Sequence, residues 1–104
     1  MITAIVQFKL PPGTTRAQAA ALFRQSAPKY RGLAGLVRKY YVFGKDGTAG
    51  GVYLWESRAA AEKVHDAAWR KTIAERYGAA PTISYFDTPV IVDNARGEIV
   101  EAAA

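Results

Sequence analysis

The spacing of hydrophobic residues predicts a strand and then a helix in the first third of the chain. Residues 2–9 alternate between apolar and mixed positions, which is the period of a strand with one buried face. Apolar residues three and four apart predict a helix that ends near Ala27, because Pro28 disfavours its continuation. The segment Thr15-Arg16-Ala17-Gln18 has the form of a capping box and marks the start of this helix.

The remaining pattern predicts three more strands and one long helix. They are a strand over residues 36–45, a strand over 49–56, a helix over 58–77 and a strand over 82–92 that is interrupted or ends near residue 89. Asp46-Gly47 is a hairpin signal, Ser57 is a suitable N-cap, and Gly78 is a helix stop. Gly50-Gly51 near the start of a strand predicts a bulge or a close approach of two backbones.

These boundaries predict one domain over residues 1–92 and a C-terminal tail over residues 93–104. Within the tail, Ile99-Val100 could pair as a short edge strand, which would leave part of the tail ordered at the edge of a dimer. The final residues, Ala102-Ala103-Ala104, are expected to be loose.

The order βαββαβ predicts an α+β fold of the ferredoxin-like type with an antiparallel sheet. In a lone domain of this kind both helices cover one sheet face, and the strands alternate cleanly because the other face meets water. Three of the predicted strands instead carry bulky apolar side chains on both faces. They are Leu36, Val37, Tyr40, Tyr41, Val42 and Phe43 in the first, Val52, Tyr53, Leu54 and Trp55 in the second, and Ile83, Tyr85 and Phe86 in the third. A second layer is therefore expected, and a homodimer whose sheets face each other supplies it.

The amino-acid composition limits the classes of partner that the protein is expected to bind. The chain has 104 residues, half of them hydrophobic, and a net charge of +5, but no basic run exceeds two residues. This pattern indicates a solvated surface that could attract a negatively charged small molecule, and the strands lack the basic and glycine pattern of RNA-binding βαββαβ domains. With no apolar run of about 18 residues and no signal peptide, we expect a cytoplasmic protein that binds neither membrane nor nucleic acid.

The segment Gly50-Gly51-Val52-Tyr53-Leu54-Trp55, followed by a capped helix, resembles the dimeric α+β barrel superfamily. Within it the chain is most similar to the small YdhR-type family, whose members resemble antibiotic biosynthesis monooxygenases. The resemblance covers roughly residues 2–92 and implies a cofactor-free enzyme that oxidises activated phenols or quinols with molecular oxygen. The same barrel also hosts dismutases, isomerases, cyclases, dehydratases, haem-degrading enzymes and ligand-binding regulators, so the fold does not determine the reaction.

His65 is the candidate catalytic base, since a histidine exchanges protons near neutral pH and a cofactor-free oxygenase must deprotonate its substrate. Its alternative role is that of an edge residue that bonds a nearby carbonyl. Arg38 is a second catalytic candidate, and it or its neighbour Lys39 could bind a carboxylate, an enolate or developing superoxide. Alternatively, Arg38 lies at a strand end or pairs with an acid across the dimer interface.

Aromatic side chains are the candidates for binding substrate, because they would stack a planar molecule and orient it with hydroxyl and indole N–H groups. The candidates are Phe23, Tyr40, Tyr53, Trp55, Trp69 and Tyr85. Their alternative role is to fill the core and the dimer interface. A single histidine and no cysteine argue against a zinc or non-haem iron site, although one histidine could in principle ligate haem.

We therefore predict a cofactor-independent monooxygenase with a small aromatic or quinol-like substrate, no metal and no cofactor. The pocket is expected between the sheet and the helices, with His65 as base and Tyr53, Trp55 and Trp69 as walls. Two alternatives stay open: a different small-molecule enzyme on the same scaffold, such as a cyclase, isomerase or dismutase, and a non-catalytic dimeric ligand-binding protein.

Overall fold

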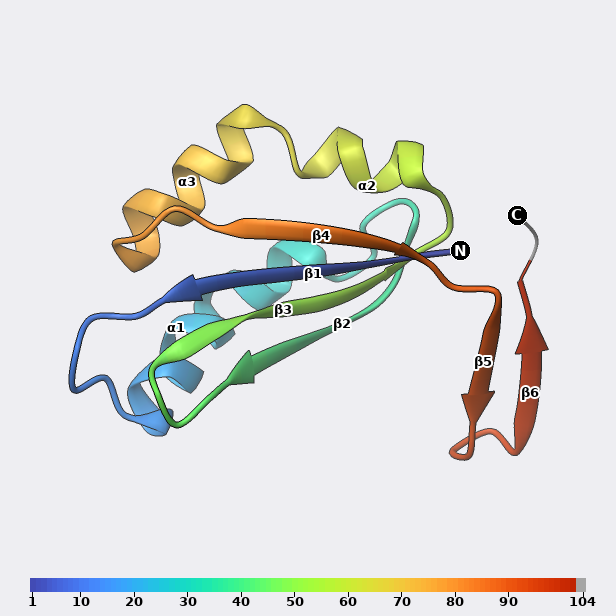
Figure 1. The fold of residues 1–104 in the computed structure, drawn as a ribbon, viewed down its shortest axis with the longest axis horizontal. Helices are drawn as coiled ribbons and strands as arrows, with labels where there is room; N and C mark the ends of the chain where they lie inside the picture. Colours follow the sequence, from blue (N-terminus) through green and yellow to red (C-terminus); the bar gives the residue numbers. More distant parts are fainter. Residues whose placement is uncertain (103–104) are drawn as a thin grey trace.

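The computed structural model describes residues 1–102, so the expectation for Ala103 and Ala104 lies outside the described residues. Four antiparallel strands form the main sheet in the order β2-β3-β1-β4 (Figure 1). Their bounds are β1 Ile2–Lys9, β2 Leu36–Phe43, β3 Thr48–Trp55 and β4 Thr82–Asp87. This arrangement confirms the predicted α+β, ferredoxin-like fold class.

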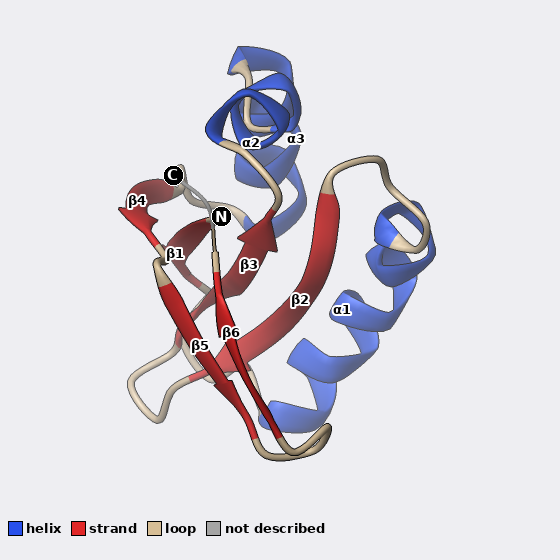
Figure 2. Ribbon diagram, turned by 90° about the vertical axis from the view of Figure 1, so that its right-hand side faces the viewer, coloured by secondary structure: helices blue, strands red, loops and turns tan. Residues whose placement is uncertain are grey.

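Three helices lie on one side of this sheet. They are α1 Arg16–Tyr30, α2 Arg58–Val64 and α3 Ala67–Tyr77. Figure 2 shows α1 running along β2 while α2 and α3 lie apart from it, over the other half of the sheet. No helix in the described part of the chain is long and apolar enough to cross a membrane.

The last two strands form a hairpin of their own. β5 Val90–Asp93 pairs with β6 Glu98–Glu101, and Figure 2 shows this hairpin on the side of the sheet away from the helices. The predicted interruption near Pro89 is confirmed, because β4 ends at Asp87. Ile99 and Val100 do form a strand, but they pair with β5 and not with the main sheet, so the predicted limit at residue 92 falls inside the hairpin.

The prediction of one helix over residues 58–77 was wrong. The helix breaks at His65, and Asp66 caps a new helix by accepting a hydrogen bond from the Trp69 backbone N–H at 2.8 Å. Aspartate favours this N-cap position because its carboxylate satisfies an N–H that has no partner within the helix. The break lies at the candidate site, because His65 is the C-cap of α2.

The end of α1 also differs from the prediction. The capping box is present, with the Thr15 hydroxyl accepting from Gln18 N–H at 3.2 Å and the Gln18 amide oxygen accepting from Thr15 N–H at 2.9 Å. The helix nevertheless continues through Pro28 to Tyr30. The Tyr30 ring packs edge-on against Tyr53 at 5.8 Å between ring centroids, and this packing offsets the helix hydrogen bond that a proline removes.

The core lies between the helices and one face of the sheet, where every second residue of β1 is buried together with Ala49, Gly51, Tyr53 and Trp55 of β3. Gly50 has φ +157°, and a Cβ there would overlap the carbonyl oxygen of Val6 on β1. The predicted close approach of two backbones is thus present at Gly50. The register of β3 is continuous there, and the irregularity lies in β2, between Leu36 and Arg38.

Candidate functional site

His65 lies at the junction of α2 and α3 and is enclosed by aromatic rings. Its centroid is 4.7 Å from that of Tyr53, 5.4 Å from that of Trp55 and 4.4 Å from that of Trp69, each in an edge-on arrangement. The side chain is only 3% exposed, and neither ring nitrogen has a hydrogen-bond partner in the described part of the chain. A buried imidazole without a partner is uncommon and calls for an explanation.

Lys39 points to the same side of the sheet as His65. It lies opposite Tyr53 in the β2–β3 register. Its Nζ is 3.5 Å from the ring centroid of Tyr30, 3.8 Å from that of Tyr41 and 4.5 Å from that of Tyr53. These distances are within the range of cation–π contacts. We call Lys39 with these three tyrosines the lysine cage.

Gly51 makes room for the lysine cage. A Cβ at this position would lie 2.8 Å from Cε1 of Tyr53 and 3.0 Å from Cε of Lys39. Both distances are shorter than ordinary van der Waals contact. The absence of a side chain at Gly51 therefore lets the lysine stem and the Tyr53 ring lie side by side.

Two side-chain hydrogen bonds tie the helices to this cluster. The Trp69 indole N–H donates to the Tyr30 hydroxyl at 2.9 Å and so joins α3 to α1. The hydroxyls of Ser26 and Tyr41 are 2.7 Å apart and join α1 to β2. The aromatic cluster is thus closed on its helix side by the Tyr30–Trp69 bridge.

Little free space remains inside. The interior cavity has a volume of about 10 Å³, room for roughly one water molecule, and its lining includes Tyr30, Lys39, Tyr41, Tyr53 and Trp69. The pocket expected between sheet and helices is therefore occupied by its own aromatic walls. A haem macrocycle does not fit there, and residues 1–102 contain no group of three or more His, Asp or Glu that could hold a metal ion.

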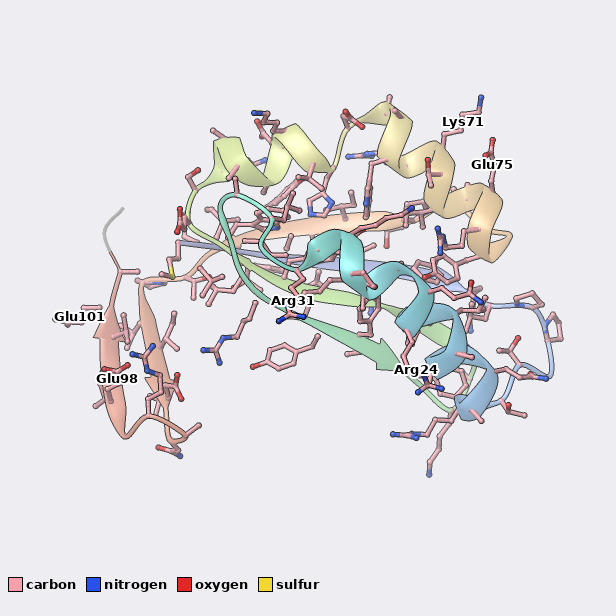
Figure 3. All side chains as sticks on the ribbon, turned by 180° about the vertical axis from the view of Figure 1, so that it is seen from behind. Arg24, Arg31, Lys71, Glu75, Glu98 and Glu101 are labelled. Atoms are coloured by element: carbon pink, nitrogen blue, oxygen red, sulfur yellow. The ribbon has the colours of Figure 1, made fainter. Side chains whose placement is uncertain are left out.

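A surface hollow of about 280 Å³ lies next to the interior cavity. It is found where α1 runs into β2, and its lining includes Arg31 and Arg38. Figure 3 labels Arg31 at this end of α1. Tyr30, Lys39 and Tyr41 line both the hollow and the cavity, so these three side chains form the wall between them.

Burial lowers the pKa values of both bases of the site, so that His65 is neutral and Lys39 is partly neutral near physiological pH. Burial, with contributions from the charges of Lys39 and Arg70, lowers the pKa of His65 to about 4. Burial, with a contribution from the charge of Arg76, lowers the pKa of Lys39 to about 7. Burial raises the pKa of Tyr53, so its hydroxyl stays protonated. The site therefore combines two proton acceptors with proton-donating phenols.

The other predicted site residues fall into two groups. Trp55 and Phe23 are buried on the helix side, Trp55 beside His65 and Phe23 stacked on Tyr41 with 4.9 Å between ring centroids. Tyr85 is 6.3 Å from His65 between ring centroids, at the β4 edge of the cluster.

Arg38 and Tyr40 lie on the opposite face of the sheet from His65. In the register Arg38 is opposite Leu54 and Tyr40 is opposite Val52. The Arg38 guanidinium lies 3.5 Å from a carboxylate oxygen of Asp93 and donates to the Tyr40 hydroxyl at 3.4 Å. The structure does not bring these two residues together with the histidine, and Arg38 pairs with an acid of its own chain.

Sequence reasoning missed two walls of the lysine cage, Tyr30 and Tyr41, and considered Lys39 only as an alternative to Arg38 for binding an anion. The available signal was the shared parity of Lys39 and Tyr41 in β2, which places both on one face of the sheet. Tyr30 could have been found from its position at the end of the helix stripe.

Comparison with solved structures identifies proteins that have the same architecture as this chain. A monooxygenase from the gene ActVA-Orf6 of Streptomyces coelicolor, solved with the ligand nanaomycin D, superposes with a TM-score of 0.64 at 18% identity, covering 88% of this chain and 89% of that one. An antibiotic biosynthesis monooxygenase superposes with a TM-score of 0.63 at 16% identity, covering 85% and 98%. The chain has the antibiotic biosynthesis monooxygenase fold.

Another structure with this monooxygenase fold is SnoaB, a cofactor-independent oxygenase from Streptomyces nogalater. It superposes with a TM-score of 0.61 at 14% identity, covering 84% of this chain and 91% of SnoaB. No protein-family profile and no curated protein sequence matches the chain. The resemblance to the dimeric α+β barrel superfamily is thus confirmed in the fold, and the YdhR-type assignment stays a prediction.

Proposed function

We propose that this protein is a cofactor-independent monooxygenase that acts on small phenols or quinols, with His65 as a base. The observation that carries the proposal is the buried imidazole with two unpartnered nitrogens among Tyr53, Trp55 and Trp69. A neutral imidazole can accept a proton, and the surrounding rings suit a planar aromatic substrate. The shared fold with SnoaB and the ActVA-Orf6 monooxygenase supports the reaction class.

The proposed reaction needs no external reductant. A phenol with an unsubstituted ring position takes one oxygen atom from O₂ and becomes a quinone, while the second oxygen atom leaves as water. That water carries the two hydrogens that the substrate loses, one from its hydroxyl and one from the ring carbon that receives oxygen. The protein's part is to hold the ring and to accept these protons, and general-base assistance of this kind typically accelerates a reaction about 10²- to 10⁴-fold.

Trp69 would have to move for a substrate to reach His65. Its ring lies 4.4 Å from His65 between centroids, and its indole N–H bonds Tyr30. Trp69 is only partly buried, and it belongs to the short helix that begins at the Asp66 cap. We propose that the Trp69 side chain swings outward and that the substrate ring takes its place between His65 and Tyr30.

Oxygen uptake tests this function. Wild-type protein with a panel of hydroquinones and phenols is expected to consume oxygen above the rate of the buffer blank. His65→Phe keeps a ring of similar shape but has no nitrogen, so we expect its rate to fall by about 10²-fold or more. Thermal unfolding of this variant verifies that the fold is intact. No uptake across the panel, or an unchanged rate in a folded His65→Phe protein, would contradict the proposal.

We also propose that the chain forms a homodimer through the sheet face opposite the helices. This face carries Tyr40 and Phe86, each 54% exposed, together with Val37 and Val42. A groove of about 590 Å³ separates it from the β5–β6 hairpin, whose side chains at Val90, Val92 and Ile99 are also exposed. Contiguous exposed apolar surface of this kind marks an interface.

A charge on this face should separate the subunits. We expect Phe86→Glu to raise the dimer dissociation constant by a factor of about 30 or more, the effect of losing roughly 2 kcal/mol at an interface centre. Ala21→Glu, at an exposed position of α1, is the matched control and should leave the dimer intact. Sedimentation velocity over a range of protein concentrations measures both. A wild-type protein that sediments as a single chain at micromolar concentration would contradict the dimer.

A further inference from the structure

Lys39 is a half-buried amine inside the aromatic cluster, and its pKa of about 7 lets it exist both neutral and protonated near physiological pH. Its ammonium group contacts the faces of Tyr30, Tyr41 and Tyr53, and in the part of the chain that the structure describes it has no carboxylate partner. A buried charge is normally paired, because taking an ammonium group out of water is costly. When Lys39 is protonated, a ligand group that carries negative charge would supply the partner that it lacks.

The position of Lys39 gives such a ligand a way in. Lys39 lines the surface hollow between α1 and β2 as well as the interior cavity, and Arg31 and Arg38 line the same hollow. Arg38 is paired with Asp93, whereas Arg31 has no carboxylate partner among residues 1–102. The Arg38 guanidinium reaches Tyr40 and Asp93 on the opposite face of the sheet, so Arg31 is the arginine whose charge serves the hollow beside Lys39. A cation on a concave surface raises the local concentration of anions. An anionic aromatic molecule thus meets favourable charge first at the hollow and then at the lysine cage.

We propose that Lys39 takes up the proton of the substrate's phenolic hydroxyl and holds the resulting phenolate, so that phenols enter through the hollow between α1 and β2. In this step the O–H bond breaks, its electron pair stays on oxygen, and the proton binds the lone pair of Nζ. This inference rests on the proposed function for the identity of the substrate. It assigns the hydroxyl proton to Lys39 and leaves the ring proton to His65.

The surroundings of Lys39 suit this role. No carboxylate is among the groups that face it: these are Tyr30 from α1, Tyr41 from β2, Tyr53 from β3, Arg76 from α3 and His65 from the helix junction. Burial brings the pKa of Lys39 to about 7, where an amine exchanges protons most effectively at physiological pH. A newly formed phenolate would then meet an ammonium group at short range in a medium of low polarity.

Binding of para-nitrophenol under argon tests the proposal without any oxidation, because the absorbance of this probe reports its ionisation directly. With wild-type protein, we expect the bound probe to be the phenolate at a pH where the free probe is mostly neutral. Lys39→Met should weaken phenolate binding at least about tenfold, which is the loss of one hydrogen bond to a charged group. Lys45→Met, an exposed lysine in the β2–β3 turn, is the matched control and should bind as the wild type does.

A further variant and a comparison of the two assays keep the outcome interpretable. Lys39→Arg retains the positive charge and should restore phenolate binding if the Met variant folds poorly. Binding under argon involves no oxidation, so the two proposals can fail separately: a wild-type protein that binds the phenolate but consumes no oxygen would retain the assignment to Lys39 and contradict the proposed function. Equal binding by folded Lys39→Met protein, a bound probe that stays neutral, or no binding by wild-type protein would each overturn the assignment to Lys39.

Discussion

Replacing Trp69 with alanine is expected to lower the free energy of unfolding by about 3 kcal/mol, which lowers the melting temperature by roughly 10–20 °C in a domain of this size. The indole ring packs edge-on against His65 and Tyr53, and its N–H bonds the Tyr30 hydroxyl. The substitution removes all three contacts and leaves a void beneath the helices. Chemical denaturation followed by fluorescence or circular dichroism measures the loss.

The same substitution should create a binding site. An apolar cavity of ring size tends to stay dry and to bind small aromatic molecules. Indole added to Trp69→Ala protein should therefore raise its melting temperature, and the rise should grow with ligand concentration as expected for binding to the folded state alone. Wild-type protein, whose cavity of about 10 Å³ is too small for a ring, should respond much less.

Trp69→Phe separates packing from hydrogen bonding at this position. The phenyl ring fills most of the space but cannot donate to Tyr30, so the variant should lose only about 1 kcal/mol and should bind no indole. If Trp69→Ala were as stable as Trp69→Phe, or if indole left it unchanged, Trp69 would not be the side chain that occupies the proposed substrate position.

The strands and turns of the domain could be predicted because each depends on residues that lie close together in the sequence. Alternation over residues 2–9 predicts the strand β1, and the Asp46-Gly47 turn predicts the β2–β3 hairpin, in which Gly47 has φ +82°. The break at His65 could not be found in the same way. The helical stripe continues through it, and only the capping preference of Asp66, a weaker signal, opposes that stripe.

The site was predictable in part for a similar reason. A period of two places Tyr53 and Trp55 on one face, and the helix stripe places His65 and Trp69 towards it. The position of Lys39 depends on a register shift between Leu36 and Arg38, which no local pattern reveals. Because both faces of β2 are apolar, the alternation there does not indicate which face meets the helices.

Stability should rise with pH in two separate windows, and the two unpartnered bases cause the rise. His65 has its pKa lowered from 6.5 to about 4 in the folded protein, and Lys39 from 10.5 to about 7. Between each pair of values the unfolded chain binds a proton that the folded protein does not, so the free energy of unfolding increases with pH. Each window contributes at most about 1.4 kcal/mol per pH unit, and partial access of Lys39 to solvent reduces its share.

The tyrosines set the upper limit of this rise. Burial raises the pKa values of Tyr41, Tyr53 and Tyr77 above their ordinary value of 10.0. Above that pH the unfolded chain loses phenolic protons that the folded protein retains, so stability falls again. We therefore expect a maximum close to pH 10, unusually high for a domain whose stability would otherwise peak between about pH 5 and 8.

The Lys39→Met substitution removes the Lys39 titration and therefore tests the rise in stability expected between pH 7 and 10.5. Methionine fills the space of the lysine stem without a charge, so the variant should be more stable than the wild type by about 1–4 kcal/mol at or below pH 7. This advantage should shrink steadily towards pH 10, where the wild-type amine is neutral in the folded protein. Urea unfolding at a series of pH values measures both curves, and Lys45→Met should follow the wild type throughout. Parallel curves for Lys39→Met and wild type would mean that Lys39 is hydrated and charged, and the lysine cage would then have no need of an anionic ligand.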